Sequence, residues 1–91
     1  MSDLKWKIKI KTSAKGDLKK LIRSPFYNSF KKIILTLQKN PYQPTQSFEK
    51  LTPPASGFYS RRINGQHRIV YTINNQDKIV EIYSCWSHYH N

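Results

Sequence analysis

The feature that most constrains the fold is a strict alternation of apolar residues and lysines over positions 4–11. Leu4, Trp6, Ile8 and Ile10 fall on one side, and a lysine follows each of them. Successive side chains of a β-strand point to opposite faces, so this period predicts a strand with one buried and one solvated face. The lysines could serve a polyanionic ligand, or could simply solvate the outer face and protect an edge strand.

Two helical patterns follow this strand. In the first, Leu18, Leu21 and Ile22 share one face of a helix, and Thr12 or Ser13 is the candidate N-cap. A hydroxyl side chain at that position can accept a hydrogen bond from a free N–H group of the first turn. We therefore predict a short helix that begins directly after the strand.

The second helical pattern begins at Ser24-Pro25, where a cap residue precedes a proline suited to the first helical position. Apolar residues then recur at helical spacing, namely Phe26, Phe30, Ile33, Ile34 and Leu37. Asn40-Pro41 ends the helix after Lys39, because the residue before a proline disfavours helical geometry. The two helices predict an α-hairpin whose apolar stripe belongs to the core.

Three more strands are predicted in the second half of the chain, over residues 58–63, 68–73 and 78–84. Asn64-Gly65 is a strong tight-turn signal between the first two, and residues 74–77 supply the next turn. We expect an antiparallel meander, which the first strand joins to give a small, twisted, antiparallel-rich sheet. The fold class is α+β, with the helix pair on one face and a free, basic face where a ligand would lie.

Composition limits both the architecture and the partners. Ninety-one residues predict one domain, residues 1–91, and the single cysteine cannot form an internal disulfide. No apolar run resembles a signal peptide or a membrane span, so we expect a cytoplasmic protein that does not bind membranes through a spanning segment. The formal charge of +11 predicts a polyanionic partner, with nucleic acid first, an acidic protein second and an anionic membrane surface third.

Metal and thiol chemistry are set aside. Cys85, His88 and His90 cluster near the end of the chain, but one cysteine and two histidines lack the paired spacing of a zinc site. Cys85 lies at the end of a predicted strand, where a buried structural thiol is the commoner case. We expect no metal and no cofactor.

The remaining polar residues suit RNA cleavage without metal. That reaction needs a base for the 2′-OH proton, an acid for the leaving 5′-oxygen and a cation for the charge on phosphorus. Glutamate, histidine and arginine can fill these roles, and the sequence offers Glu49, Arg68 and His88. Several candidate site residues also have a simpler explanation. Glu49 could pair with one of many lysines, His67 could be a surface residue beside a turn, and a residue in the tail is often disordered.

A family resemblance sharpens this reading. The run GFYSRRINGQHRIVYTI, residues 57–73, resembles the signature of YoeB-family toxins, and the C-terminal Cys85, His88 and Tyr89 resemble that family's ending. Glu49 precedes Gly57 by eight residues, where the family keeps a glutamate in a Lys-Pro-Glu-x-Leu-like segment. The resemblance implies a RelE-like fold and ribosome-dependent cleavage of mRNA in the A site. The products would be a 2′,3′-cyclic phosphate and a 5′-OH.

The resemblance also implies roles for individual residues. Glu49 would be the general base, His88 the general acid and Arg68 the transition-state stabiliser, while Tyr89 would orient the scissile nucleotide. The residues expected to bind RNA are Lys5, Lys7, Lys9, Lys50, Tyr59, Arg61, Arg62 and His67. Three features depart from the family pattern, namely Gln66 in place of an acid, Thr52 in place of a basic residue, and an extension past Tyr89 that includes His90.

The expected partners are mRNA and the ribosome, including 16S rRNA at the A site, and an acidic YefM-like antitoxin whose disordered tail covers the basic cleft. A homodimer is a further possibility. Three alternatives stay open at this point: a ParE-like gyrase poison with the same fold, an RNA- or ribosome-binding module without chemistry, and an inactive family member retained in a complex.

Overall fold

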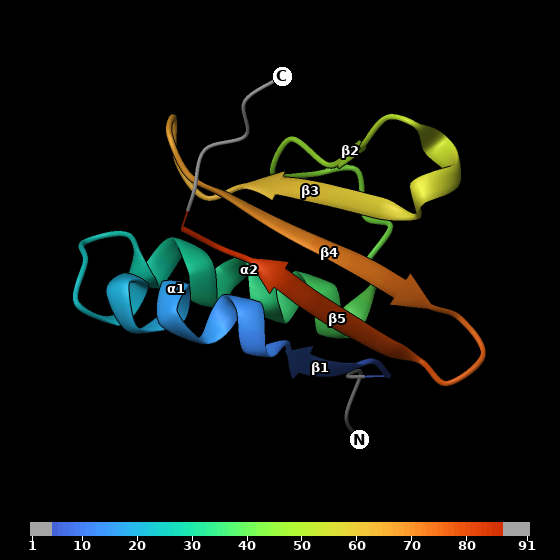
Figure 1. Ribbon diagram of the computed structural model, residues 1–91, viewed down its shortest axis with the longest axis horizontal. Helices are drawn as coiled ribbons and strands as arrows, with labels where there is room; N and C mark the ends of the chain where they lie inside the picture. The colour runs from blue at the N-terminus through green and yellow to red at the C-terminus, as the bar shows by residue number, and fades with distance from the viewer. Residues whose placement is uncertain (1–4, 87–91) are drawn as a thin grey trace.

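The structure, a computed structural model, describes residues 5–86 (Figure 1). Its helices and strands follow in the order β1 Lys7–Ile10, α1 Thr12–Ile22, α2 Tyr27–Lys39, β2 Glu49–Lys50, a 3₁₀ turn at Pro54–Ser56, β3 Phe58–Arg62, β4 Arg68–Asn74 and β5 Ile79–Ser84. The predicted helix pair and all four predicted strands are present, each within a few residues of its expected bounds. The short strand β2 is an addition to the prediction.

The five strands form one mixed sheet in the order β1-β5-β4-β3-β2. The predicted meander is confirmed, since β3 and β5 both lie antiparallel to β4. The first strand joins it at the far edge, parallel to β5, with Lys7 opposite Ile79 and Ile10 opposite Ile82. The opposite edge is β2, which pairs antiparallel with β3 and places Glu49 opposite Ser60.

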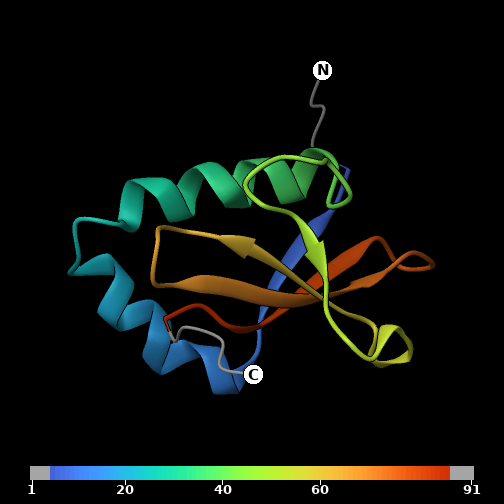
Figure 2. The same cartoon turned by 90° about the horizontal axis from the view of Figure 1, so that it is seen from above.

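The helices cover one face of the sheet, which we call the helix face (Figure 2). Apolar residues of α1 and α2 share a core with alternate residues of the strands, and this core contains Leu21, Phe30, Ile33, Leu37, Ile69, Tyr71, Val80 and Ile82. The strand residues between those core positions point to the other side. We call that side the open face, and it carries Ser60, Arg62, Arg68, Val70 and Thr72.

The helix starts differ from the prediction. The cap position of α1 is Lys11 and makes no side-chain cap bond, while the Ser13 hydroxyl donates instead to the Tyr83 carbonyl at 2.7 Å. Ser13 therefore ties α1 to β5 rather than capping its own helix. Ser24 does accept a hydrogen bond from the Phe26 N–H at 3.1 Å. Ser24 lies two residues before Phe26, which occupies the cap position of α2, so it stabilises the turn that leads into the helix.

The link between β3 and β4 is wider than the predicted two-residue turn. The Ile63 N–H donates to the His67 carbonyl at 2.9 Å, which leaves Asn64, Gly65 and Gln66 in the loop. The Asn64 side-chain oxygen accepts the N–H groups of Gln66 and His67, at 2.8 and 2.6 Å. Asn64 thus stabilises the loop through its side chain, a common use of asparagine at turns.

Cys85 lies fully buried at the end of β5, as expected for a structural thiol. Its N–H donates to the Asp17 carboxylate at 3.1 Å, so the end of the sheet is tied to α1. Burial, helped by the Asp17 charge, raises the pKa of the Cys85 thiol to about 12. The thiol is therefore neutral and unreactive in the folded protein.

This raised pKa predicts a loss of stability at high pH. Below the pKa of the unfolded thiol, about 8.5, both states hold the proton and the contribution is complete. As the pH rises toward the folded pKa, the unfolded chain loses its proton first, so the free energy of unfolding falls. We expect wild type to lose about 2 kcal/mol more than Cys85→Ala between about pH 8 and about pH 10.5 in urea unfolding. Parallel losses in the two proteins would contradict this assignment.

Candidate active site

Glu49 and Arg68 form an ion pair on the open face. An Arg68 guanidinium nitrogen lies 3.0 Å from a Glu49 carboxylate oxygen, although the two residues belong to β2 and β4. Strand β3 runs between them, and Arg68 reaches across it. The side chains are 56% exposed for Glu49 and 25% for Arg68. An exposed ion pair contributes at most about 1 kcal/mol to folding, so this contact is open to exchange with a ligand.

Ser60 lies on β3 between the two charged residues, opposite Glu49 on one side and Val70 on the other. It is only 1% exposed, and its hydroxyl oxygen has no hydrogen-bond partner among residues 5–86. A buried hydroxyl without a partner costs free energy. The Ser60 hydroxyl is thus a buried polar group between Glu49 and Val70.

Arg62 adds a second positive charge to this site. It ends β3 directly opposite Arg68 on the open face, and it is exposed. Like charges directly opposite each other on neighbouring strands are destabilising, by roughly 0.2–1 kcal/mol. Two facing arginines with a single carboxylate beside them form a place where a phosphate would be stabilised.

Arg61 corrects the prediction that it binds RNA. The alternation of β3 turns it to the helix face, where it is 0% exposed. Its guanidinium donates to the Tyr71 hydroxyl at 3.0 Å, to the carbonyls of Pro41 and Thr45 at 2.9 and 2.8 Å, and to the Gln46 side chain at 3.3 Å. Burial raises the pKa of Tyr71 to about 12, against the opposing effect of Arg61, so this hydroxyl stays neutral. Arg61 is a structural residue.

The segment that Arg61 holds leads directly to Glu49. Within it, Gln46 and Ser47 both have φ of 55°, in the left-handed region that residues other than glycine rarely adopt. Such residues cost on the order of 1–3 kcal/mol each and persist only where neighbouring contacts fix them. The Arg62 N–H also donates to the Gln46 carbonyl at 2.8 Å. These contacts fix the approach of the chain to Glu49.

Lys50 and Tyr59 lie away from the ion pair, and their expected binding of RNA stays a prediction. They are paired residues on the helix side of β2 and β3, and the Lys50 ammonium lies 5.8 Å from the centre of the Tyr59 ring. Tyr59 stacks between Phe48 and Tyr71, with ring centres 5.6 and 5.9 Å away. The strand alternation places both on the face opposite Glu49 and Arg68.

His67 is inside the protein rather than on its surface. It is 6% exposed, and its ring stacks on Trp86 with centres 4.1 Å apart and planes at 20°. Phe26 contacts both rings, at 5.8 and 6.5 Å. This aromatic cluster fixes Trp86, the last residue that the structure describes. The expected catalytic residues His88 and Tyr89, together with His90, lie outside the described residues.

The strand-one lysines remain a prediction. Lys5, Lys7 and Lys9 are all exposed, and the register places Lys7 and Lys9 on the open face. Their strand is four positions away from β2 in the sheet, or roughly 19 Å at about 4.8 Å per strand. They therefore belong to a separate part of the surface from Glu49. Nearby, Lys11 pairs with Glu81 at 3.6 Å.

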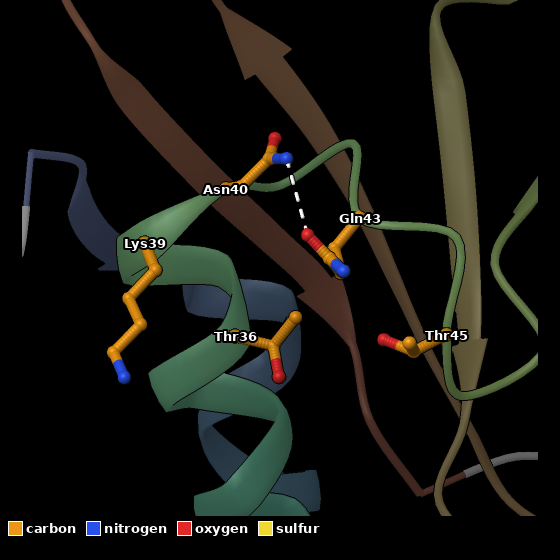
Figure 3. A pocket seen from close by; sticks show the side chains of 5 residues that line it. All are labelled: Thr36, Lys39, Asn40, Gln43 and Thr45. Atoms are coloured by element: carbon orange, nitrogen blue, oxygen red, sulfur yellow. Dashed lines mark hydrogen bonds between the residues drawn. The ribbon is translucent and has the colours of Figure 1, made fainter.

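Of the surface pockets that the described residues form, two are relevant to these groups. The larger, about 380 Å³, lies at the end of α2 and is lined by Thr36, Lys39, Asn40, Gln43 and Thr45 (Figure 3). Its lining is polar, with an Asn40–Gln43 hydrogen bond at 3.4 Å, and includes none of the predicted site residues. The smaller, about 210 Å³, is lined by Leu51, Thr52, Ser56, Phe58 and Val70. It borders the Glu49–Arg68 site, because Leu51 and Val70 each lie two residues from one member of the ion pair.

Within the described residues no group of three or more histidine, cysteine, aspartate or glutamate side chains is placed to hold a metal ion. Over the same residues, no helix is both long and apolar enough to cross a membrane.

Comparison with known proteins identifies the family and the fold. The model of a YoeB-like toxin of bacterial type II toxin–antitoxin systems matches residues 20–89. Toxin YoeB of Synechocystis sp. is 40% identical over 57 residues, which are 63% of this chain and 64% of that protein. That match therefore spans slightly less than two thirds of the relative's length.

Solved structures agree over most of the chain. A YoeB/ParE toxin from Agrobacterium tumefaciens has a TM-score of 0.81 at 25% identity, covering 91% of this chain and 99% of its own. YoeB from Staphylococcus aureus, solved as a dimer, has a TM-score of 0.79 at 30% identity over 93% and 99% of the two chains. The same protein in a heterotetrameric complex with YefM gives 0.76 at 29% identity over 92% and 98%.

Two helices packed on a five-stranded mixed sheet are thus the fold of the RelE-like toxins of toxin–antitoxin systems. The family model covers most of the chain, including the strands that carry Glu49, Arg62 and Arg68. The chain belongs to the YoeB family, and the resemblance read from residues 57–73 is confirmed.

Proposed function

We propose that this toxin is a ribosome-dependent endoribonuclease that cleaves mRNA in the A site by metal-free acid–base catalysis. The observation that carries the proposal is the Glu49–Arg68 contact at 3.0 Å, with Arg62 directly opposite Arg68. A carboxylate and two guanidinium groups meet on an exposed face, as a base and a phosphate-binding pair must.

The reaction follows from this arrangement. The substrate phosphate takes the place of Glu49 on Arg68, which frees the carboxylate to accept the 2′-OH proton. The 2′-oxygen attacks phosphorus, the bond from phosphorus to the 5′-oxygen breaks, and a 2′,3′-cyclic phosphate and a 5′-OH result. Arg68 and Arg62 stabilise the charge that develops on the phosphate oxygens. His88 donates the proton to the leaving oxygen, and Tyr89 stacks on the scissile nucleotide.

The open face supports the proposed dependence on a ribosome. Glu49 is more than half exposed, and the pocket beside it measures only about 210 Å³. Such a site positions a flexible RNA poorly by itself, whereas mRNA in the A site is already held in place by 16S rRNA and the decoding centre. A charge of +11, with Lys5, Lys7 and Lys9 exposed at the far edge of the sheet, provides affinity for ribosomal RNA.

The same charge favours an acidic antitoxin that covers the site when translation is to be spared. YoeB from Staphylococcus aureus was solved with YefM, and also as a dimer, which supports a YefM-like antitoxin and a homodimer for this chain. The cytoplasm is the compartment in which both the ribosome and such a partner are found.

Primer extension on mRNA tests the function directly. We expect cleavage within the A-site codon of programmed ribosomes, at least ten times faster than on the same mRNA free in solution. A purified acidic antitoxin should abolish it, and its association should weaken with added salt. Growth arrest without RNA cleavage would instead support a gyrase poison. Ribosome binding without cleavage would support a non-catalytic module or an inactive family member.

A further inference from the structure

The small pocket on the open face has the position and chemistry of a nucleobase site. The Leu51 N–H donates to the Phe58 carbonyl at 2.9 Å, which continues the β2–β3 pairing by one residue. Leu51 therefore lies on the same face as Glu49, two residues further along its strand. Val70 bears the same relation to Arg68 on β4. The pocket is thus one side-chain step, roughly 6–7 Å, from the ion pair on both strands.

The size and lining of the pocket fit one base. Its volume of about 210 Å³ is below the roughly 300 Å³ at which sites for drug-sized molecules begin, so it admits a single ring system and excludes a dinucleotide. Leu51, Phe58 and Val70 give it apolar and aromatic walls, and Phe58 is held edge-on by Tyr83 with ring centres 5.1 Å apart. Thr52 and Ser56 add hydroxyl groups that can bond to the edge of a base.

Charge identifies the occupant. Arg62 and Arg68 lie at one side of the pocket, so a ligand that binds both features carries an anion and a flat apolar group about one side-chain step apart. Ser60 of β3 lies opposite both Glu49 and Val70, so a ligand that bridges the two features would cross this strand. A nucleotide of RNA matches this description, with its phosphate at the arginines and its base in the pocket.

We propose that this pocket, lined by Leu51, Thr52, Ser56, Phe58 and Val70, receives the base of a nucleotide beside the scissile phosphate and sets the base preference of cleavage. The inference rests on the proposed ribonuclease activity. The base fixes the register of the RNA, so that the 2′-OH meets Glu49 while the phosphate meets Arg68. The pocket contributes to positioning within the bound complex rather than to affinity for the ribosome.

Val70→Phe fills the pocket, and Thr72→Phe is its matched control on the same strand and face but outside the pocket lining. On programmed ribosomes at saturating concentration, we expect Val70→Phe to lower the single-turnover cleavage rate at least tenfold and to level the rates among A-site codons. Thr72→Phe should keep both the rate and the preference. Thr52→Phe, at an exposed loop position, repeats the test without a change in the sheet, and thermal unfolding monitors the fold of all three.

An mRNA that lacks one base next to the cleavage site completes the test. The cleavage rate of wild type should fall on the abasic mRNA by about the same factor as the rate of Val70→Phe falls on normal mRNA. The rate of Val70→Phe on the abasic mRNA should be no lower than the rate with either change alone. Additive losses, or wild-type rates for both pocket variants, would overturn the base site while leaving the ribonuclease proposal intact. A wild-type protein that cleaves no mRNA would overturn both.

Discussion

Replacing Glu49 by glutamine is expected to lower the single-turnover rate of mRNA cleavage by about 10²–10⁴-fold, because the amide cannot accept the 2′-OH proton. Arg68→Ala should cost a comparable factor, since the charge on phosphorus would lose its nearest cation. Arg68→Lys should recover only part of this loss, because an ammonium lacks the two-pronged geometry of a guanidinium. The assay is cleavage at saturating ribosome concentration, which separates chemistry from binding.

The C-terminal histidines provide an internal control for this prediction. His88→Ala should remove the leaving-group acid at a cost of the same order, while His90→Ala should stay near wild type. An essential His90 with a dispensable His88 would show that the tail has been matched to the family incorrectly. If Glu49, His88 and His90 all prove dispensable, the chain is a binding module and not a nuclease.

The second large effect concerns stability. Arg61→Met is expected to lower the free energy of unfolding by about 3–5 kcal/mol, because it removes the hydrogen bonds that the charged guanidinium donates to the Tyr71 hydroxyl and to the carbonyls of Pro41 and Thr45. Methionine retains much of the packing on Phe48, whose ring centre lies 4.7 Å from the guanidinium carbon. Urea or thermal unfolding measures the loss.

The neighbouring Arg62 is the matched control. It is exposed on the open face, so Arg62→Met should change stability by no more than about 0.5 kcal/mol. The two variants should show opposite patterns, with Arg61→Met mainly unstable and Arg62→Met stable but weak in cleavage. Equal stability of the two proteins would contradict the structural role assigned to Arg61.

Much of this architecture follows from local sequence patterns. The period of two in residues 4–11, the helical spacing from Phe26 to Leu37 and the turn residues after Asn64 and Asn74 predicted every long element. Each of these patterns also has a strong tertiary reason to persist, because one face of each element is buried in the shared core. The two residues of β2 are too few to show a period.

The faces of the strands were harder to predict than the strands themselves. Residues 58–62, Phe-Tyr-Ser-Arg-Arg, do not alternate between apolar and polar, so periodicity does not say which arginine points inward. The inward arginine is Arg61, whose acceptors include two carbonyls and the Gln46 side chain of a loop 15 to 20 residues earlier in the chain. His67 was misplaced for a similar reason, since a histidine beside a turn gives no sign of a stacking partner such as Trp86, 19 residues later.

The contact between Glu49 and Arg68 could be predicted from the sequence only in part. The resemblance named both residues, but their contact depends on β2, which sets Glu49 at the edge of the sheet within reach of a side chain two strands away. Likewise, the cross-strand position of Arg62 follows from the β3–β4 register, and the loop at residues 63–67 fixes that register.

The parallel pairing of β1 with β5 determines when the protein can finish folding. Ile8 and Val80 are direct neighbours in the sheet although 72 residues separate them, so the sheet closes only after nearly the whole chain is available. During synthesis the N-terminal half emerges first, and β1 with both helices must wait for its partner strand. Under the proposed function, a protein that attacks ribosomes would therefore gain its native sheet only after β5 has left the ribosome that makes it.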